Sequence, residues 1–189
     1  MSIVTKTGDQ GETGRFGGGR IKKTNPRISA IGDVDELNSA IGLLSARTDL
    51  PLEINEDIKT IQATCFTIGS NLSTPTDAPQ EAQEYIPRLK EEDLSFLEKK
   101  VDELEHQLSS QNAFILPGGR AAASMSFWIR AICRRAERST VASHELEEVP
   151  ALMLQYLNRL SDYFYVLARF LNQEAGVEET QWKGGHKFD

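Results

Sequence analysis

The segment that begins at Pro150 constrains the fold more than any other part of the sequence. It reads ALMLQYLNRLSDYFYVLARFLN, and its apolar residues cover most of the circumference of a helix with about 3.6 residues per turn. The polar exceptions are Asn158, Arg159 and Asp162. A helix that is apolar nearly all round must be covered by other elements, so we expect it to lie centrally among further helices.

Four other segments carry apolar residues at helical spacing. The first begins at Asn25-Pro26, an N-cap residue followed by proline at the first helical position, and extends to about Arg47. The remaining segments are 54–72, 90–108 and 120–147, and the loops that separate them include 73–88 and 112–119. The leucines of the segment 90–108 follow a 3-4 repeat, which is typical of a helix in a bundle.

The sequence therefore predicts an all-α fold, an up-down, ferritin-like bundle of five helices. We expect one domain over residues 1–189, with an amino-terminal loop at 1–24, the bundle at 25–175 and a polar tail at 176–189. No strand is expected apart from a few residues around Ile3.

The overall composition is that of a soluble globular protein, with 39% hydrophobic and 26% charged residues. A net charge of −7 argues against non-specific binding to nucleic acid or to anionic membranes. Cys65 and Cys133 both lie in apolar helical contexts and do not make a disulfide scaffold. No run is long enough to span a membrane, and the amino terminus lacks an apolar signal core. We therefore expect a reduced, cytoplasmic protein.

The segment RAICRRAER places Arg130, Arg134 and Arg138 at positions i, i+4 and i+8, where they form one basic stripe on a helix. The opposite arc, which we expect to face the core, consists of Met125, Trp128, Ile129, Ile132, Cys133 and Ala136. Guanidinium groups stay charged, and their planar fork fits phosphate oxygens, so the stripe is a candidate anion site. A solvated charged face is the alternative that the stripe alone leaves open.

The first 24 residues combine six glycines with threonines, lysines and arginines. Glycine lets backbone amides approach a ligand closely, while hydroxyl groups and cations supply further donors, as a loop around phosphates requires. The stretch is not a Walker A loop, because Arg20-Ile21 stands where Lys-Ser/Thr is needed. By composition alone, an unstructured tail remains the alternative.

Other catalytic chemistries find little support. Glu103 and His106 form one Glu-x-x-His motif, whereas a carboxylate di-iron site needs two. His144 and His186 have no neighbours at zinc-ligand spacing, and we expect both at the surface. No Gly-x-Ser-x-Gly elbow and no Cys–His nucleophile pair is present. What remains is a polyanion site that would work by positioning substrates and stabilising the charge of a leaving group.

Five motifs, in this order, resemble those of the PduO-type ATP:cob(I)alamin adenosyltransferases: TKTGDQGETGRFGGGR, GDVDELNSAIG, FILPGG, CRRAER and YLNRLSD. The resemblance implies a five-helix bundle that forms a homotrimer with active sites between subunits. It implies attack of the cobalt(I) of cob(I)alamin on C5′ of ATP, with Mg²⁺ present, to give adenosylcobalamin and triphosphate. A reductase and an adenosylcobalamin-dependent acceptor enzyme are further partners that it implies.

The resemblance also implies roles for particular residues. The phosphate-wrapping loop would contain Thr5, Lys6, Thr7, Gly8, Thr13 and Gly14, and Lys23 would be a later phosphate contact. The ATP-binding helix segment would contain Arg134, Arg135, Ala136, Glu137 and Arg138. Asn158 would be a further nucleotide contact. Arg134 and Arg138 would be catalytic. Asp35 would pair with Arg134 across the subunit interface. Phe114 would lie under the corrin and exclude the lower axial ligand. Mg²⁺ would be held mainly by the ATP phosphates.

Two positions depart from the family pattern. Many relatives carry a second hydroxyl residue and then an apolar residue after Thr13, whereas this chain has Gly14-Arg15, so a backbone amide or Arg15 itself would replace one phosphate contact. Asp33 stands where the family often has threonine and adds negative charge near Asp35. A non-catalytic module that carries or senses ATP or a corrinoid is the alternative to an enzyme.

Overall fold

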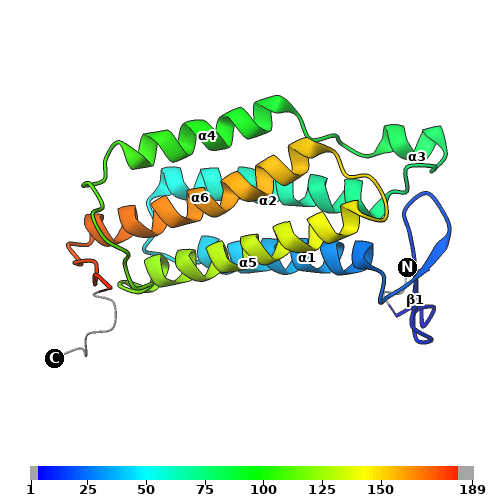
Figure 1. Ribbon diagram of the computed structural model, residues 1–189, viewed down its shortest axis with the longest axis horizontal. Helices are drawn as coiled ribbons and strands as arrows, with labels where there is room; N and C mark the ends of the chain where they lie inside the picture. Colours follow the sequence, from blue (N-terminus) through cyan, green and yellow to red (C-terminus); the bar gives the residue numbers. More distant parts are fainter. Residues whose placement is uncertain (1–3, 183–189) are drawn as a thin grey trace.

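The structure is a computed structural model that describes residues 4–182. Long helices lie side by side in an elongated bundle (Figure 1). The elements are β1 (Glu12–Gly14), β2 (Arg20–Lys22), α1 (Pro26–Ser45), α2 (Leu52–Ser73), α3 (Gln80–Tyr85), α4 (Glu91–Glu105), α5 (Ala121–His144) and α6 (Ala151–Glu174). The five long helices coincide with the five predicted segments to within one turn at each end, so the predicted helical bundle is confirmed.

Helix α6 lies centrally, as its composition predicts. It packs against both α5 and α4, and α1 in turn packs against α5 and α2. Tyr156, Tyr163 and Phe164 of α6 are fully buried, whereas Asn158 and Asp162 are exposed. Each large apolar side chain removed from water contributes roughly 1.5–3 kcal/mol, so this helix supplies a large share of the stability of the bundle.

Helix α1 begins where the sequence predicts. The side chain of Asn25 accepts a hydrogen bond from the backbone N–H of Arg27 at 2.8 Å, and Pro26 occupies the first helical position. Arg27 itself is buried, with 4% of its surface exposed, although a charged residue in the first turn of a helix usually faces solvent. Its partners are described with the site.

The structure contains a short helix and a hairpin that the sequence does not reveal. Residues 73–88 were expected to form a loop, but α3 occupies 80–85; none of its residues is buried, so no apolar periodicity signals it. β1 and β2 pair antiparallel, with Thr13 opposite Ile21. Strands of three residues are too short to show an alternating pattern. The strand expected around Ile3 lies outside the described residues.

The prediction that Trp128 belongs to the core is wrong, because half of its surface is exposed. Ile129, Ile132, Cys133 and Ala136 are buried as expected. At about 100° per residue, Trp128 lies roughly 40° from buried Ile132 on one side and about 60° from exposed Ala131 on the other, so it marks the edge of the apolar arc. A large indole at such an edge covers part of the core and leaves the rest in solvent.

The two ends of the bundle carry different features. The β1–β2 hairpin and α3 lie at one end, and the connection between α4 and α5 lies at the other, beside the carboxy-terminal segment (Figure 1). Within one copy of the chain, the glycine-rich loop and the segment that contains Phe114 therefore lie at opposite ends of the helical bundle.

Candidate functional site

The arginine segment of α5 borders a shallow depression of about 440 Å³. Its lining consists of Arg134, Glu137, Arg138, Val141, Ala142, Glu145 and Asn158. Asn158 of α6 donates a hydrogen bond from Nδ2 to Oε1 of Glu137 at 3.1 Å, which fixes both side chains at the edge of the depression. The structure thus brings together four of the residues that the sequence assigns to nucleotide binding.

Arg134 and Arg138 are exposed, and no carboxylate of the described residues 4–182 lies within ion-pairing distance of either guanidinium. Arg130, the first residue of the predicted stripe, instead lies over the ring of Tyr165, 5.4 Å from its centroid. Two guanidinium groups that lack an ion-pair partner among the described residues and line one depression with an amide are suited to binding an anion with several oxygens.

Arg135 is used differently from its neighbours. It forms ion pairs with Asp33 (3.4 Å) and Glu36 of α1. The hydrogen bond that Arg135 donates to Glu36 raises the pKa of Arg135, and Asp33 adds to the effect. Ala136 is completely buried, so its side chain faces the core and not the depression. Of the five residues in this segment, Arg135 thus contacts α1 and the side chain of Ala136 packs in the core, and their assignment to ATP binding stays a prediction.

Asp33 and Asp35 point to different neighbours. Asp33 accepts a hydrogen bond from the hydroxyl of Ser139 in addition to its ion pair with Arg135. The aspartate at this position, where the family pattern often has threonine, therefore links α1 to α5. Asp35 is exposed and lines a groove between α1 and α2. Within one chain, Asp35 and Arg134 form no ion pair among the described residues.

The amino-terminal loop is ordered by its own side chains. Arg20 donates to the backbone oxygens of Thr7 (2.6 Å) and Glu12 (3.3 Å). Lys6 has a φ of 57°, a left-handed conformation that non-glycine residues seldom adopt, and its side chain is exposed. The hydroxyls of Thr5 and Thr7 lie 3.1 Å apart. The loop is thus a folded unit and not an unstructured tail.

Lys23 lies directly over Gly8. A Cβ at Gly8 would stand 3.2 Å from Nζ of Lys23, so the lysine uses the space that the missing side chain leaves. Thr13 is half-buried in the hairpin, and a Cβ at Gly14 would meet nothing within 4 Å. The candidate phosphate ligands therefore lie on one folded loop, at the same end of the bundle as the carboxyl end of α5 (Figure 1).

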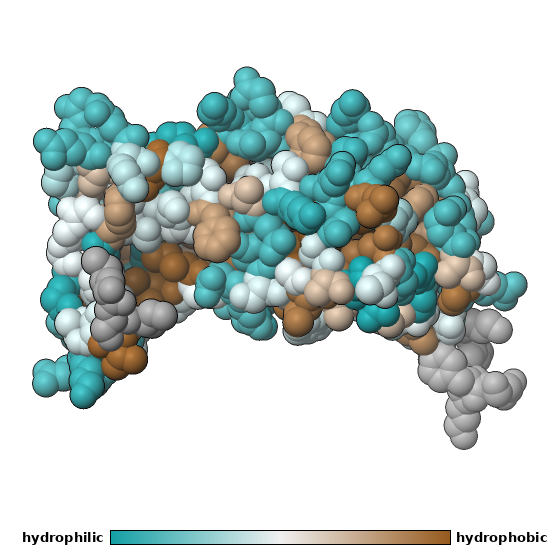
Figure 2. Space-filling view, turned by 180° about the vertical axis from the view of Figure 1, so that it is seen from behind, coloured by the Kyte–Doolittle hydropathy of each residue, from teal (hydrophilic) through white to brown (hydrophobic). Residues whose placement is uncertain are grey.

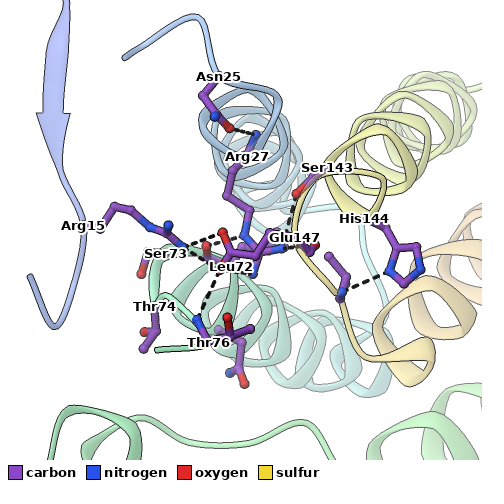
Figure 3. A network of polar contacts seen from close by, with 12 residues as sticks. Arg15, Asn25, Arg27, Leu72, Ser73, Thr74, Thr76, Ser143, His144 and Glu147 are labelled. Carbon is purple, nitrogen blue, oxygen red and sulfur yellow. Dashed lines mark hydrogen bonds and ion pairs between the residues drawn. The ribbon is translucent and has the colours of Figure 1, made fainter. Parts of the chain in front are cut away.

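Arg15 points away from this set. Its Nη2 atom lies 2.8 and 2.9 Å from the two carboxylate oxygens of Glu147, in the connection between α5 and α6 (Figure 3). In this structure Glu147 therefore occupies the guanidinium of Arg15, which favours the backbone amide as the replacement for the phosphate contact. Burial would raise the pKa of Glu147, but hydrogen bonds from Arg15 and the N–H of Thr76, with the charges of Arg27 and Arg15, lower it overall.

Phe114 is strongly exposed, at 76%. Its ring lies edge-on to that of Trp182, with centroids 6.4 Å apart. The backbone of residues 180–182 runs along residues 114–116, since the N–H of Trp182 donates to the oxygen of Phe114 at 2.7 Å and the N–H of Leu116 donates to Thr180 at 2.8 Å. Two aromatic rings thus form a surface at the end of the bundle that a flat apolar ligand could cover.

The remaining candidates lie outside the site. His144 is exposed, as expected, and its Nδ1 accepts a hydrogen bond from the N–H of Val149; His186 lies outside the described residues. Cys65 and Cys133 are buried free thiols, and burial raises the pKa of Cys65 to about 12. Residues 4–182 contain no group of three or more His, Cys, Asp or Glu side chains that could hold a metal ion. Nor does any helix in that range have the length and apolarity needed to cross a membrane.

Sequence reasoning missed Arg27 and Glu147. Nε of Arg27 donates to the backbone oxygen of Leu72 at 2.9 Å, and Nη1 donates to the hydroxyl of Ser143 at 3.2 Å. Burial lowers the pKa of Arg27, and the nearby charge of Glu147 opposes that effect. The one signal in the sequence was the unusual Arg15, whose partner lies 132 positions away and could not be identified from spacing.

Comparison with known proteins agrees with the resemblance seen in the motifs. The family model for cobalamin adenosyltransferases matches residues 3–171, so the chain belongs to the cobalamin adenosyltransferase family. A corrinoid adenosyltransferase from Bacillus subtilis is 40% identical over 187 residues, covering 97% of this chain and 93% of that protein. The human corrinoid adenosyltransferase MMAB is 39% identical over 178 residues, covering 94% of this chain and 71% of the human protein.

The fold agrees as well. A variant of the PduO-type ATP:corrinoid adenosyltransferase from Lactobacillus reuteri, solved in complex with cobalamin and ATP, superposes with a TM-score of 0.90. It is 33% identical and covers 97% of this chain and all of that one. The chain therefore has the PduO-type fold.

Proposed function

We propose that this protein transfers the 5′-deoxyadenosyl group of ATP to the cobalt of reduced cob(I)alamin, with adenosylcobalamin and triphosphate as products. Besides family membership, one observation carries the proposal: Arg134 and Arg138 lack carboxylate partners within residues 4–182 and face a depression that Asn158 also lines. A polyanion would supply the missing charge, and the folded glycine-rich loop lies at the same end of the bundle (Figure 1).

In this mechanism cobalt(I) donates an electron pair to C5′ of ATP, the C5′–oxygen bond breaks, and its electrons leave with the triphosphate. The chain therefore supplies charge stabilisation and no nucleophile. Arg138 and Lys6 stabilise the charge that develops on the leaving group, and Asn158 holds the nucleotide. The triphosphate is bound by Thr5, Lys6, Thr7, Gly8, Thr13, Gly14 and Lys23 and by Arg134 and Arg138, whereas Glu137 and Asn158 contact the rest of the nucleotide at the edge of the depression. Mg²⁺ enters with ATP, because phosphate oxygens are the hard ligands that it prefers.

Phe114 contacts the corrin and excludes a lower axial ligand from the cobalt. The support is its exposure of 76% together with the neighbouring ring of Trp182, since an exposed pair of aromatic rings gains most from a flat apolar partner. A cobalt without a lower axial ligand is easier to reduce than one that has it. The proposal also includes a reductase that delivers cob(I)alamin and an acceptor enzyme that takes adenosylcobalamin.

The active assembly is a homotrimer with sites between copies. Large apolar side chains remain exposed on the long helices, namely Leu43, Phe66, Trp128 and Val141. Apolar residues also interrupt the hydrophilic face in several places (Figure 2). Asp35 and Arg134, unpaired with each other within one chain, become partners across the interface. Sedimentation should give a mass near three times 21.0 kDa; a monomer at micromolar concentration would contradict the trimer.

We further propose that residues 1–189 act as one domain and that the protein is cytoplasmic, which two buried free thiols favour. The alternative function is a carrier or sensor that binds ATP or a corrinoid without chemistry. Anaerobic incubation with ATP, Mg²⁺ and chemically reduced cobalamin separates the two. A carrier or sensor would bind ATP or the corrinoid, and the absorbance spectrum would remain that of the unalkylated corrin. An enzyme would produce adenosylcobalamin over many turnovers.

A further inference from the structure

Residues 15–17 attach the glycine-rich loop to the bundle at several points. Arg15 forms its two contacts with Glu147 and has only 14% of its side chain exposed. The N–H of Phe16 donates to the backbone oxygen of Ser73 at 3.1 Å. The ring of Phe16 stacks on that of Tyr85 of α3, with centroids 5.9 Å apart. These contacts fix the middle of the loop while its amino-terminal part, with Lys6, projects into solvent.

Gly17 brings the loop against α3 and the residues before it. With φ at 86°, it adopts a conformation that favours glycine, and a Cβ there would stand 2.9 Å from Cβ of Ala78 and 3.1 Å from Cβ of Ala82. The short helix α3 and the residue Ala78 before it thus provide a surface against which the loop packs.

Glu147 is itself held by a second set of donors, seen in Figure 3. The backbone N–H of Thr76 donates to Oε1 at 3.1 Å. Arg27 of α1, whose side chain is 5% exposed, places Nη2 3.9 Å from the same oxygen. One carboxylate therefore faces two guanidinium groups, one from the loop and one from α1, and its own position is set by the bundle.

We propose that Arg15 and Glu147 form a latch that positions the glycine-rich loop for ATP, with both as positioning residues that do not touch the nucleotide. The inference rests on the proposed function. Arg15 directly follows Gly14, and its N–H also donates to the oxygen of Gly19 at 3.2 Å, so the residue that forms the latch also closes the turn between β1 and β2. A loop held in place before binding loses less conformational entropy when ATP arrives.

The latch depends on a cationic donor at position 15, where the chain has Arg15. An apolar side chain at position 15 could pack at this end of the bundle but could not donate a hydrogen bond to the carboxylate of Glu147. The Arg15–Glu147 pair is also shielded from solvent, with Glu147 20% exposed, so salt screens it less than a surface pair.

The test compares Glu147→Gln and Arg15→Met with Glu98→Gln, a control that removes the carboxylate paired with Arg159 at 3.1 Å, on the surface between α4 and α6. We expect each latch variant to raise the Kd for ATP, measured by calorimetry, about tenfold, with KM for ATP rising in parallel. kcat at saturating ATP and KM for cob(I)alamin should stay within twofold of the parent. The control should change neither constant.

The double variant Arg15→Met/Glu147→Gln should bind ATP no more weakly than the worse single variant, because both changes break one contact. Additive losses, or an unchanged Kd in both single variants, would overturn the latch.

Hydrogen exchange without ATP separates this inference from the proposed function. Amides of residues 12–22 should exchange faster in both latch variants than in the parent and the control. If the parent shows no turnover while exchange increases in the variants, the proposed function fails and the latch stands as a structural contact. If the parent is active and the variants show neither faster exchange nor weaker ATP binding, the latch is refuted and the function is untouched.

Discussion

The amide of Asn158 donates to the carboxylate of Glu137 across 3.1 Å, and this hydrogen bond joins α6 to the arginine segment of α5. Both side chains line one depression together with Arg134 and Arg138. Two helices that are adjacent in the core thus also share the candidate nucleotide site, and the packing of α6 against α5 holds the site in shape.

Replacing Arg138 with alanine should lower kcat by about two to three orders of magnitude, since losing one donor to a developing anion typically removes about 2–4 kcal/mol of transition-state stabilisation. Arg138 is exposed and makes no ion pair within residues 4–182, so the thermal midpoint should hardly change. Steady-state kinetics and a melting curve check both parts. Lys99→Ala, which removes an exposed cation on α4, serves as the control. An Arg138→Ala enzyme with the parent's kcat would remove this residue from the mechanism.

Exchanging charges tests the pairing of Asp35 with Arg134 between copies. Asp35→Arg and Arg134→Asp should each weaken the trimer, because two like charges would meet at the interface. The double variant should recover trimer by restoring opposite charges. Sedimentation velocity at several protein concentrations measures this directly. A double variant that dissociates as readily as the single variants would contradict the pair.

Gly119→Ala should destabilise the fold by about 3 kcal/mol. Gly119 has a φ of 104°, and a Cβ there would stand 2.1 Å from Oδ1 of Asn172, a buried side chain that also accepts from the N–H of Arg120 and donates to the oxygen of Gly118. Gly118→Ala is the matched control, since a Cβ at Gly118 meets nothing within 4 Å. Denaturant unfolding of both variants gives the comparison, and equal midpoints would show that the turn accommodates a side chain.

The lowered pKa of Glu147 predicts how stability depends on pH. Because the folded pKa lies below the ordinary value of 4.5, the charged carboxylate stabilises the fold above about pH 4.5, and this contribution is lost as the pH falls through the folded value. The parent should therefore be more stable than Glu147→Gln at pH 7, and the difference in stability should narrow as the pH falls from 7 to below 4.5. A gap that stays constant across this range would mean that the carboxylate charge contributes nothing to folding.

Helical periodicity was sufficient to predict the long helices, because each buries a continuous apolar face. It also placed Arg134 and Arg138 on one stripe and marked Asn158 as a polar exception on an apolar helix, whereas the assignment of Asn158 to the nucleotide came from the resemblance. It failed where the partner is distant in the chain. The role of Asp33 depends on Arg135 and Ser139 of another helix, and the direction of Arg15 depends on Glu147.

Local signals were also too weak for some elements. The helix α3 buries none of its residues, so no pattern of apolar positions marks it. Trp128 is apolar and lies at the edge of the apolar arc of α5. At such a position, the packing of neighbouring elements decides whether the side chain is buried, and half of the surface of Trp128 is exposed. Tertiary packing, which no single segment encodes, decides both cases.

The most direct test of the proposed reaction is the ratio of products in a single turnover. Protein in excess over cob(I)alamin is mixed anaerobically with ATP and Mg²⁺, adenosylcobalamin is followed by corrin absorbance, and the phosphate products are separated by ion exchange. Attack of cobalt on C5′ predicts one triphosphate for each adenosylcobalamin formed. ADP and phosphate in place of triphosphate, or a corrin that stays unalkylated while ATP is bound, would contradict the proposed adenosyl transfer.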